Sequence, residues 1–124
     1  EKCFLQKKQE MFTSFRAVIN SKVTVGVTTT LLRDKIAMRG KILACNLTKL
    51  EYNNFPISGI CTLNNFSYDE FEKRLLEIYS ISKESYFSKI DKDPNYVEKY
   101  DENHTSIDLI REKLFHYGVN KNLK

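Results

Sequence analysis

The chain has 124 residues, of which 41% are hydrophobic and 12% aromatic, enough for one packed domain. Its 20 basic and 16 acidic residues are interspersed rather than gathered on one face, and the net charge is only +4, which argues against a nucleic-acid partner. No run approaches the ~20 apolar residues of a membrane-spanning helix. The sequence therefore predicts a single domain over residues 1–124 with no transmembrane segment.

Cysteine usage points to a reducing compartment. Cys3, Cys45 and Cys61 are far apart, odd in number and without C-x-x-C spacing. Cys45 and Cys61 lie in apolar runs and are predicted to be inert core thiols. We expect a cytoplasmic protein, or one held at the inner face of the membrane through a parent protein. Because the first residue is Glu1 and not Met, we also expect a piece of a longer polypeptide.

The first half of the chain predicts a strand, a helix and a second strand after an opening helix. Apolar residues at helical spacing predict the opening helix over residues 6–19. Two short apolar runs, 23–27 and 42–45, are typical of buried parallel strands. A helix over 31–39 lies between them, with Gly40 at the position expected for its C-cap. Such a unit forms a right-handed βαβ crossover.

The middle of the chain predicts a loop, a strand and a longer helix. Residues 48–58 are polar and contain Asn-Asn-Phe-Pro, a loop signal, and residues 57–63 suit a third strand. Ser67 and Glu70 have the spacing of a capping box, which starts a helix. The buried side of that helix is predicted to carry four apolar residues: Phe71, Leu75, Leu76 and Ile78.

The last third predicts two more helices. A serine-capped short helix covers 82–90, and a charged connection runs over 91–103. Thr105 and Asp108 are placed to cap a final helix, followed by a frayed tail at 119–124. Four residues are predicted on the buried face of the final helix: Ile107, Ile110, Leu114 and Phe115. The whole pattern is α/β, with a short parallel sheet flanked by helices.

The threonine turn that follows the first strand is the main candidate site. Ligands of parallel α/β sheets bind where strands end and helices begin, and Thr28, Thr29 and Thr30 occupy such a point. Their hydroxyls, the backbone amides and the positive end of the helix favour a phosphate or another anion. Threonine is also a common helix cap, so a purely structural role stays open.

Two segments resemble a known enzyme family. Residues 26–43 read Gly-Val-Thr-Thr-Thr-Leu-Leu-Arg-Asp-Lys-Ile-Ala-Met-Arg-Gly-Lys-Ile-Leu. This resembles the nucleotide-sugar-binding βαβ unit of GT-B glycosyltransferases, in which a Ser/Thr turn precedes a helix ending in a pattern such as Glu-Ala-Leu-Ala-x-Gly-Lys. Residues 93–112, from Asp-Pro-Asn-Tyr-Val to Leu-Ile-Arg-Glu, are similar to the C-terminal segment of bacterial surface-polysaccharide proteins with this fold. Related turns occur in sugar-nucleotide epimerases.

The resemblance implies a Rossmann-like three-layer domain, one half of a GT-B fold, that binds the sugar donor. Thr28, Thr29 and Thr30 then correspond to the turn that holds the donor diphosphate. The family's carboxylate for ribose or sugar hydroxyls falls on Lys35, beside Asp34, and an ammonium group cannot accept hydrogen bonds. Asp34, Lys35 and Arg33 are the candidates to bind the donor ribose or sugar: either Asp34 replaces the carboxylate with a shifted register, or this site recognises its ligand differently. Arg33 and Lys35 are also candidates to meet the diphosphate, with simple solvation as the alternative.

The implied partners are a nucleotide-sugar, a glycan acceptor and an N-terminal half-domain that this chain lacks. Neither a metal nor a cofactor other than the donor is implied, and the chain alone is not expected to turn over. Two other functions remain open: a stand-alone α/β interaction module, or a fragment of an epimerase.

Residues elsewhere in the chain suggest the edges of a site. His104 and Asn103 precede the final helix and are candidates for a site edge, with solvation or capping as the alternative. The acidic residues near them match no calcium or zinc spacing. Seven tyrosines divide into two groups. Those in loops are candidates to reach a sugar: Tyr52, Tyr96 and Tyr100. Those in helices are predicted to pack: Tyr68, Tyr79, Tyr86 and Tyr117.

Overall fold

The computed structural model describes residues 13–97, 101, 103 and 105–121. In chain order its elements are α1 (Thr13–Asn20), β1 (Val23–Gly26), α2 (Thr30–Ala37), β2 (Lys41–Asn46), η1 (Glu51–Asn53), β3 (Thr62–Asn64), α3 (Tyr68–Ser80), α4 (Lys83–Phe87), η2 (Pro94–Tyr96) and α5 (Ser106–Lys121), where η marks a 3₁₀ turn. The predicted α/β class is confirmed, and residues 6–12 of the expected first helix lie outside the described residues.

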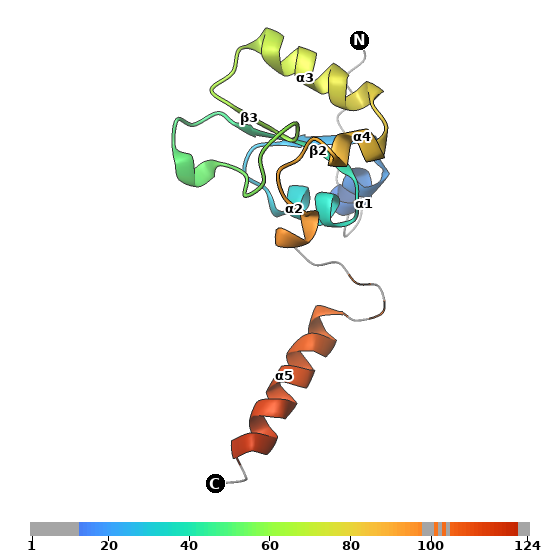
Figure 1. The fold of residues 1–124 in the computed structure, drawn as a ribbon, viewed down its shortest axis with the longest axis vertical. Coiled ribbons are helices and arrows are strands. Elements are labelled where there is room, and N and C mark those ends of the chain that lie inside the picture. Colours follow the sequence, from blue (N-terminus) through green and yellow to red (C-terminus); the bar gives the residue numbers. More distant parts are fainter. Residues whose placement is uncertain (1–12, 98–100, 102, 104, 122–124) are drawn as a thin grey trace.

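A parallel sheet in the order β1-β2-β3 forms the centre of the fold. Figure 1 shows α3 over one face of this sheet and α1 and α2 over the other, the three layers of a Rossmann-like domain. Every residue of β2 is buried, as expected for a central parallel strand. The strands predicted at 23–27 and 42–45 are thus confirmed as β1 and β2.

The third strand is shorter than the predicted span of 57–63. Only Thr62–Asn64 pairs with β2, and the preceding residues form a turn at Gly59, whose φ is +105°. Ile57 and Cys61 are still fully buried, because this turn folds back against Ile90. The apolar run at 57–63 therefore contributes to the core, but most of it does not form a strand.

A tyrosine hydroxyl completes the core beside β2. Tyr86 is fully buried; its hydroxyl donates to the carbonyl oxygen of Ile42 at 2.9 Å and accepts from the Ile42 amide at 3.1 Å. Around it the largest fully buried side chains come from all three layers: Leu32, Ile36, Leu43, Ile57 and Ile78. Burial raises the pKa of the Tyr86 phenol. The packing role predicted for this tyrosine is confirmed.

Gly40 does not supply the left-handed residue at the end of α2. That conformation belongs to Arg39, with φ of +57°, and the amides of Gly40 and Arg39 donate to the carbonyls of Lys35 and Ile36 in a Schellman motif. Gly40 instead gives room to the Lys35 side chain, which a Cβ at this position would overlap. The C-cap of α2 is Met38 and the left-handed residue after it is Arg39, so the C-cap prediction for Gly40 was wrong.

The predicted capping signals at the starts of α3, α4 and α5 are confirmed. The Ser67 hydroxyl accepts from the Glu70 amide, and the Glu70 carboxylate accepts from the Ser67 amide at 2.7 Å, a complete capping box. Ser82 caps α4, which ends at Phe87 rather than at residue 90. At α5 the Asp108 carboxylate accepts from the Thr105 amide at 3.1 Å.

Several residues predicted to be buried are exposed. Leu76 of α3 is 61% exposed, because only one narrow side of that helix packs on β2. Figure 1 shows α5 extending away from the α/β layers. Its four predicted core residues, Ile107, Ile110, Leu114 and Phe115, are each more than half exposed. This helix continues to Lys121 through most of the predicted tail, and residues 122–124 lie outside the described part.

Candidate functional site

The threonine turn joins the carboxyl end of β1 to the first residue of α2. Thr29 is the N-cap, with extended backbone angles, and its hydroxyl oxygen accepts from the Leu31 amide at 3.3 Å. The turn therefore has the helix-capping role that the sequence left open. Thr30 is the first helical residue, and an amide at this position has no acceptor within its own helix. Helix ends of this kind attract anions.

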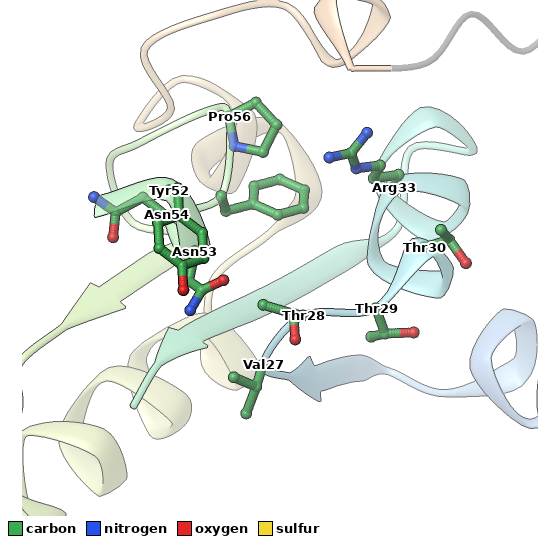
Figure 2. Close-up of a pocket in the computed structure, with 10 residues that line it drawn as sticks. Val27, Thr28, Thr29, Thr30, Arg33, Tyr52, Asn53, Asn54 and Pro56 are labelled. Carbon is green, nitrogen blue, oxygen red and sulfur yellow. The ribbon is translucent and has the colours of Figure 1, made fainter. Parts of the chain in front are cut away.

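A pocket of about 390 Å³ opens beside the turn. The segment after β1 forms one wall and the segment after β2, which contains η1, forms the other. Since β1 and β2 are neighbouring parallel strands, this is the crevice at the carboxyl ends of strands where such sheets bind ligands. Figure 2 shows its residues, which are Val27, Thr28, Thr29, Thr30, Arg33, Tyr52, Asn53, Asn54, Phe55 and Pro56.

The charge of the pocket lining is positive. Among its ten residues Arg33 is the one charged group, and no carboxylate is present. In Figure 2 the Arg33 guanidinium extends from α2 toward the opposite wall, near Pro56. Its side chain is exposed to solvent. With the threonine hydroxyls and the start of α2, this arrangement offers hydrogen-bond donors and positive potential to an anion.

The opposite wall is held by a network of amide side chains. The Asn53 side-chain amide donates to the Thr48 hydroxyl at 2.7 Å. Asn46, at the end of β2, donates to the Asn54 side-chain oxygen at 2.6 Å and to the Leu50 carbonyl at 3.0 Å. These bonds fix the loop against the sheet. The Tyr52 side chain, on the same loop, is 80% exposed and does not pack in the core.

Only part of this wall is predictable from the sequence. Tyr52 was predicted to be able to reach a ligand, and it lines the pocket. The sequence indicates only a loop for Asn53, Asn54, Phe55 and Pro56, although these residues form most of the wall. The available clue was that this loop follows the neighbouring parallel strand, so its start had to lie at the same sheet edge as the threonine turn.

Lys35 lies away from the pocket. Two residues along an α-helix correspond to about 200° of rotation, so Lys35 and Arg33 point in different directions. The Lys35 ammonium donates to the carbonyl oxygens of Ile19 at 2.8 Å and Ser21 at 2.9 Å, and its residue is only 6% exposed. Burial, with a smaller effect from Lys83, lowers its pKa. Lys35 therefore holds the end of α1, and neither it nor Asp34 lines the pocket.

The remaining candidates do not join the site in the described structure. Asn103 is exposed, and its backbone amide donates to the Asp101 carboxylate at 2.9 Å, away from the pocket lining. His104 lies outside the described residues. Cys45 and Cys61 are buried free thiols, and burial raises the pKa of Cys61 to about 12. The predicted core position of both cysteines is confirmed.

Two kinds of site are not found in the part of the chain that the structure describes. No group of three or more metal-ligating side chains lies together there. No helix of those residues has the length and apolar character to cross a membrane.

Comparison with protein-family models, with curated proteins and with solved structures gives no match to this chain.

Proposed function

We propose that the chain is the donor-binding domain of a glycosyltransferase that transfers a sugar from a nucleotide-sugar to a surface glycan or polysaccharide. The supporting observation is the pocket between the threonine turn and the loop after β2, with Arg33 as its charged residue. It lies at the sheet edge where Rossmann-like domains bind nucleotides. The partner half-domain carries the acceptor, and the parent protein acts in the cytoplasm or at the inner face of the membrane.

In this proposal the donor diphosphate lies against the start of α2. The hydroxyls of Thr28 and Thr30 and the amide of Thr30 donate to phosphate oxygens, and Arg33 adds a charge-assisted contact. Thr29 contributes mainly by capping the helix, since its oxygen already accepts from Leu31. A leaving diphosphate is then stabilised by fixed donors and a guanidinium, with no requirement for a divalent ion.

In this proposal the loop after β2, which forms the opposite wall of the pocket, binds the sugar or ribose hydroxyls. Because Lys35 is bonded to the end of α1, it does not take the place of the family's carboxylate. The side-chain oxygen of Asn53 accepts from hydroxyls, while that of Asn54 already accepts from Asn46, and Tyr52 offers an exposed ring for a sugar or base face.

A nuclear magnetic resonance titration of the chain tests this proposal. We expect a nucleotide diphosphate-sugar to shift the amide resonances of Thr28, Thr29 and Thr30 with a dissociation constant near ~1 mM, the weak affinity of about 4 kcal/mol expected for half a site. Arg33→Gln should weaken binding at least about tenfold, because one charge-assisted hydrogen bond contributes roughly 1.5–3 kcal/mol and about 1.4 kcal/mol corresponds to a factor of ten.

The control is Arg111→Gln, which makes the same charge change on the exposed side of α5 and should leave affinity unchanged. Thr30→Val should weaken binding while Thr29 still caps α2. Equal affinity of wild type, Arg33→Gln and Thr30→Val, or shifts confined to other parts of the chain, would contradict the diphosphate role of the turn.

A non-catalytic interaction module is the second candidate. The observation that favours it is the bond from the Leu31 amide to Thr29, which gives the turn a structural purpose without any ligand. In that case inorganic diphosphate and every nucleotide-sugar leave the turn amides unshifted, while Thr29→Ala still lowers the free energy of unfolding by about 1 kcal/mol.

A further inference from the structure

The outer edge of β1 is an open strand edge. In the part of the chain that the structure describes, β1 pairs only with β2, and it stands at the end of the sheet order. Among the described residues, no strand pairs with the other side of β1, so its backbone groups there can accept another strand. Proteins protect such edges with charged residues, proline, bulges or a covering segment. The strand sequence, Val-Thr-Val-Gly, contains neither a charged residue nor a proline, and its short length is its one protection of this kind within the described residues.

The sheet face next to this edge is apolar and incompletely covered. Val25 is 42% exposed and Val27 is 37% exposed, although strands of parallel sheets are normally buried on both faces. The helix α3 packs over β2 and leaves a groove of about 400 Å³ beside β1. Its lining is almost entirely apolar: Val25, Gly26, Val27, Cys45, Leu47, Phe66, Tyr68 and Phe71.

We propose that a second copy of this chain covers the edge, by antiparallel pairing of the two β1 strands across a two-fold axis. An occupant of the edge must itself be an extended, uncharged segment with apolar side chains on alternate positions and a free edge. The β1 strand of another copy meets each of these requirements. In the two-fold arrangement the same patch lies on both protomers, so Val25 faces Val25 and the two grooves join into one apolar layer.

Charge complementarity supports the second copy as the occupant. Antiparallel pairing brings Lys22, at the start of one β1, to the carboxyl end of the partner strand. Tyr68 lines the groove at that end, and it is followed by the acidic first turn of α3 with Asp69 and Glu70. The two-fold axis therefore places Lys22 of each protomer beside the acidic helix start of the other. The sheet becomes continuous over six strands, since each copy contributes three.

Sedimentation velocity of the whole chain from low to high micromolar concentration tests the pairing. We expect a reversible monomer–dimer equilibrium, and Val25→Lys should raise the dimer dissociation constant at least tenfold, because it places a charge in the joined groove. Leu76→Lys is the matched control: it introduces the same side chain at an exposed site of α3 outside the groove and should leave the constant unchanged.

Charge reversal identifies the orientation of the pair. Lys22→Glu and Asp69→Lys should each weaken the dimer severalfold, and the double variant should recover most of the wild-type affinity. A chain that stays monomeric at high micromolar concentration overturns the proposal. A dimer whose dissociation constant is unchanged by Val25→Lys but is raised by Leu114→Lys also overturns the proposal, because that result places the contact on the exposed apolar side of α5.

Discussion

Tyr86 satisfies both backbone groups of a residue in the buried central strand. Replacing it with Phe removes the hydroxyl but keeps the ring, so the Ile42 amide and carbonyl lose their 3.1 Å and 2.9 Å partners in a site without solvent access. Each unsatisfied buried group costs roughly 1–3 kcal/mol. We expect Tyr86→Phe to lower the free energy of unfolding by about 3 kcal/mol in urea denaturation.

Tyr79→Phe is the control for this measurement. Tyr79 is 52% exposed, and its ring lies 3.6 Å from the Lys22 ammonium, a contact that Phe retains. Its substitution should change stability by less than about 0.5 kcal/mol. A loss of equal size in both variants would show that the buried hydroxyl has no special role.

Cys61 makes stability depend on pH in alkaline solution. Burial raises its pKa from 9.0 to about 12 in the folded chain. Between these values the folded state binds more protons than the unfolded state, so stability falls as pH rises, by at most about 1.4 kcal/mol per pH unit. Stability from the protonated thiol is fully present below pH 9 and is lost above it.

The test compares wild type with Cys61→Ala in urea denaturation at pH 8 and pH 10. Lys35 and Lys41 have lowered pKa values, which make stability rise with pH toward 10.5 and oppose the thiol. The difference between the two proteins cancels the lysine contribution. We expect the wild type to lose more stability than Cys61→Ala over this interval; parallel pH curves would contradict the buried thiol as the cause.

At the level of elements, lysines hold the ends of two helices. Lys35 donates to carbonyls at the end of α1, and Lys41 donates to the Ile78 carbonyl and, at 2.8 Å, to the Ile81 carbonyl at the end of α3. A cation at a helix C-terminus pairs with unsatisfied carbonyls and with the negative end of the helix dipole. These two contacts tie both helix layers to α2 and β2.

Gly40 is necessary for one of these contacts. A Cβ at this position overlaps the Lys35 side chain, so Gly40→Ala should displace the ammonium from the end of α1 and lower the free energy of unfolding by about 1–3 kcal/mol. In a Lys35→Ala background the same substitution should cost much less, because the obstructing chain is gone. Chemical denaturation of the four proteins gives the coupling energy, and additive effects would rule out this contact as the reason for the glycine.

Helices differ in how far their burial could be predicted. The capping signals at Ser67 and Thr105 involve residues three apart, so sequence alone located both helix starts. The exposure of α5 could not be predicted, because apolar residues at helical spacing do not specify whether another surface of the chain covers them. The prediction that Leu76 is buried was wrong, because this residue lies beside the packed side of α3 and not on it.

For the whole molecule, the prediction of fold class was more successful than that of the site. Apolar runs and one intervening helix are enough to predict a parallel α/β unit, and position at a strand end predicts the threonine turn. The second wall of the pocket depends on how residues 47–61 return to the sheet. The direction of Lys35 depends on where α1 ends against α2, which no local pattern contains.

The Tyr86 hydroxyl has a consequence for the width of the sheet. Alternate residues of a parallel strand present their backbone groups to the same neighbour, and Ala44 donates to the Cys61 carbonyl on the β3 side at 2.8 Å. Ile42, two residues earlier, faces that side where β3 has not yet begun. The Tyr86 hydroxyl thus takes the place of a residue in a neighbouring strand, because it donates one hydrogen bond to Ile42 and accepts another from it, as a peptide unit would. Extending β3 by two residues toward its start would require the loss of this side chain, so the short strand and Tyr86 can change only together.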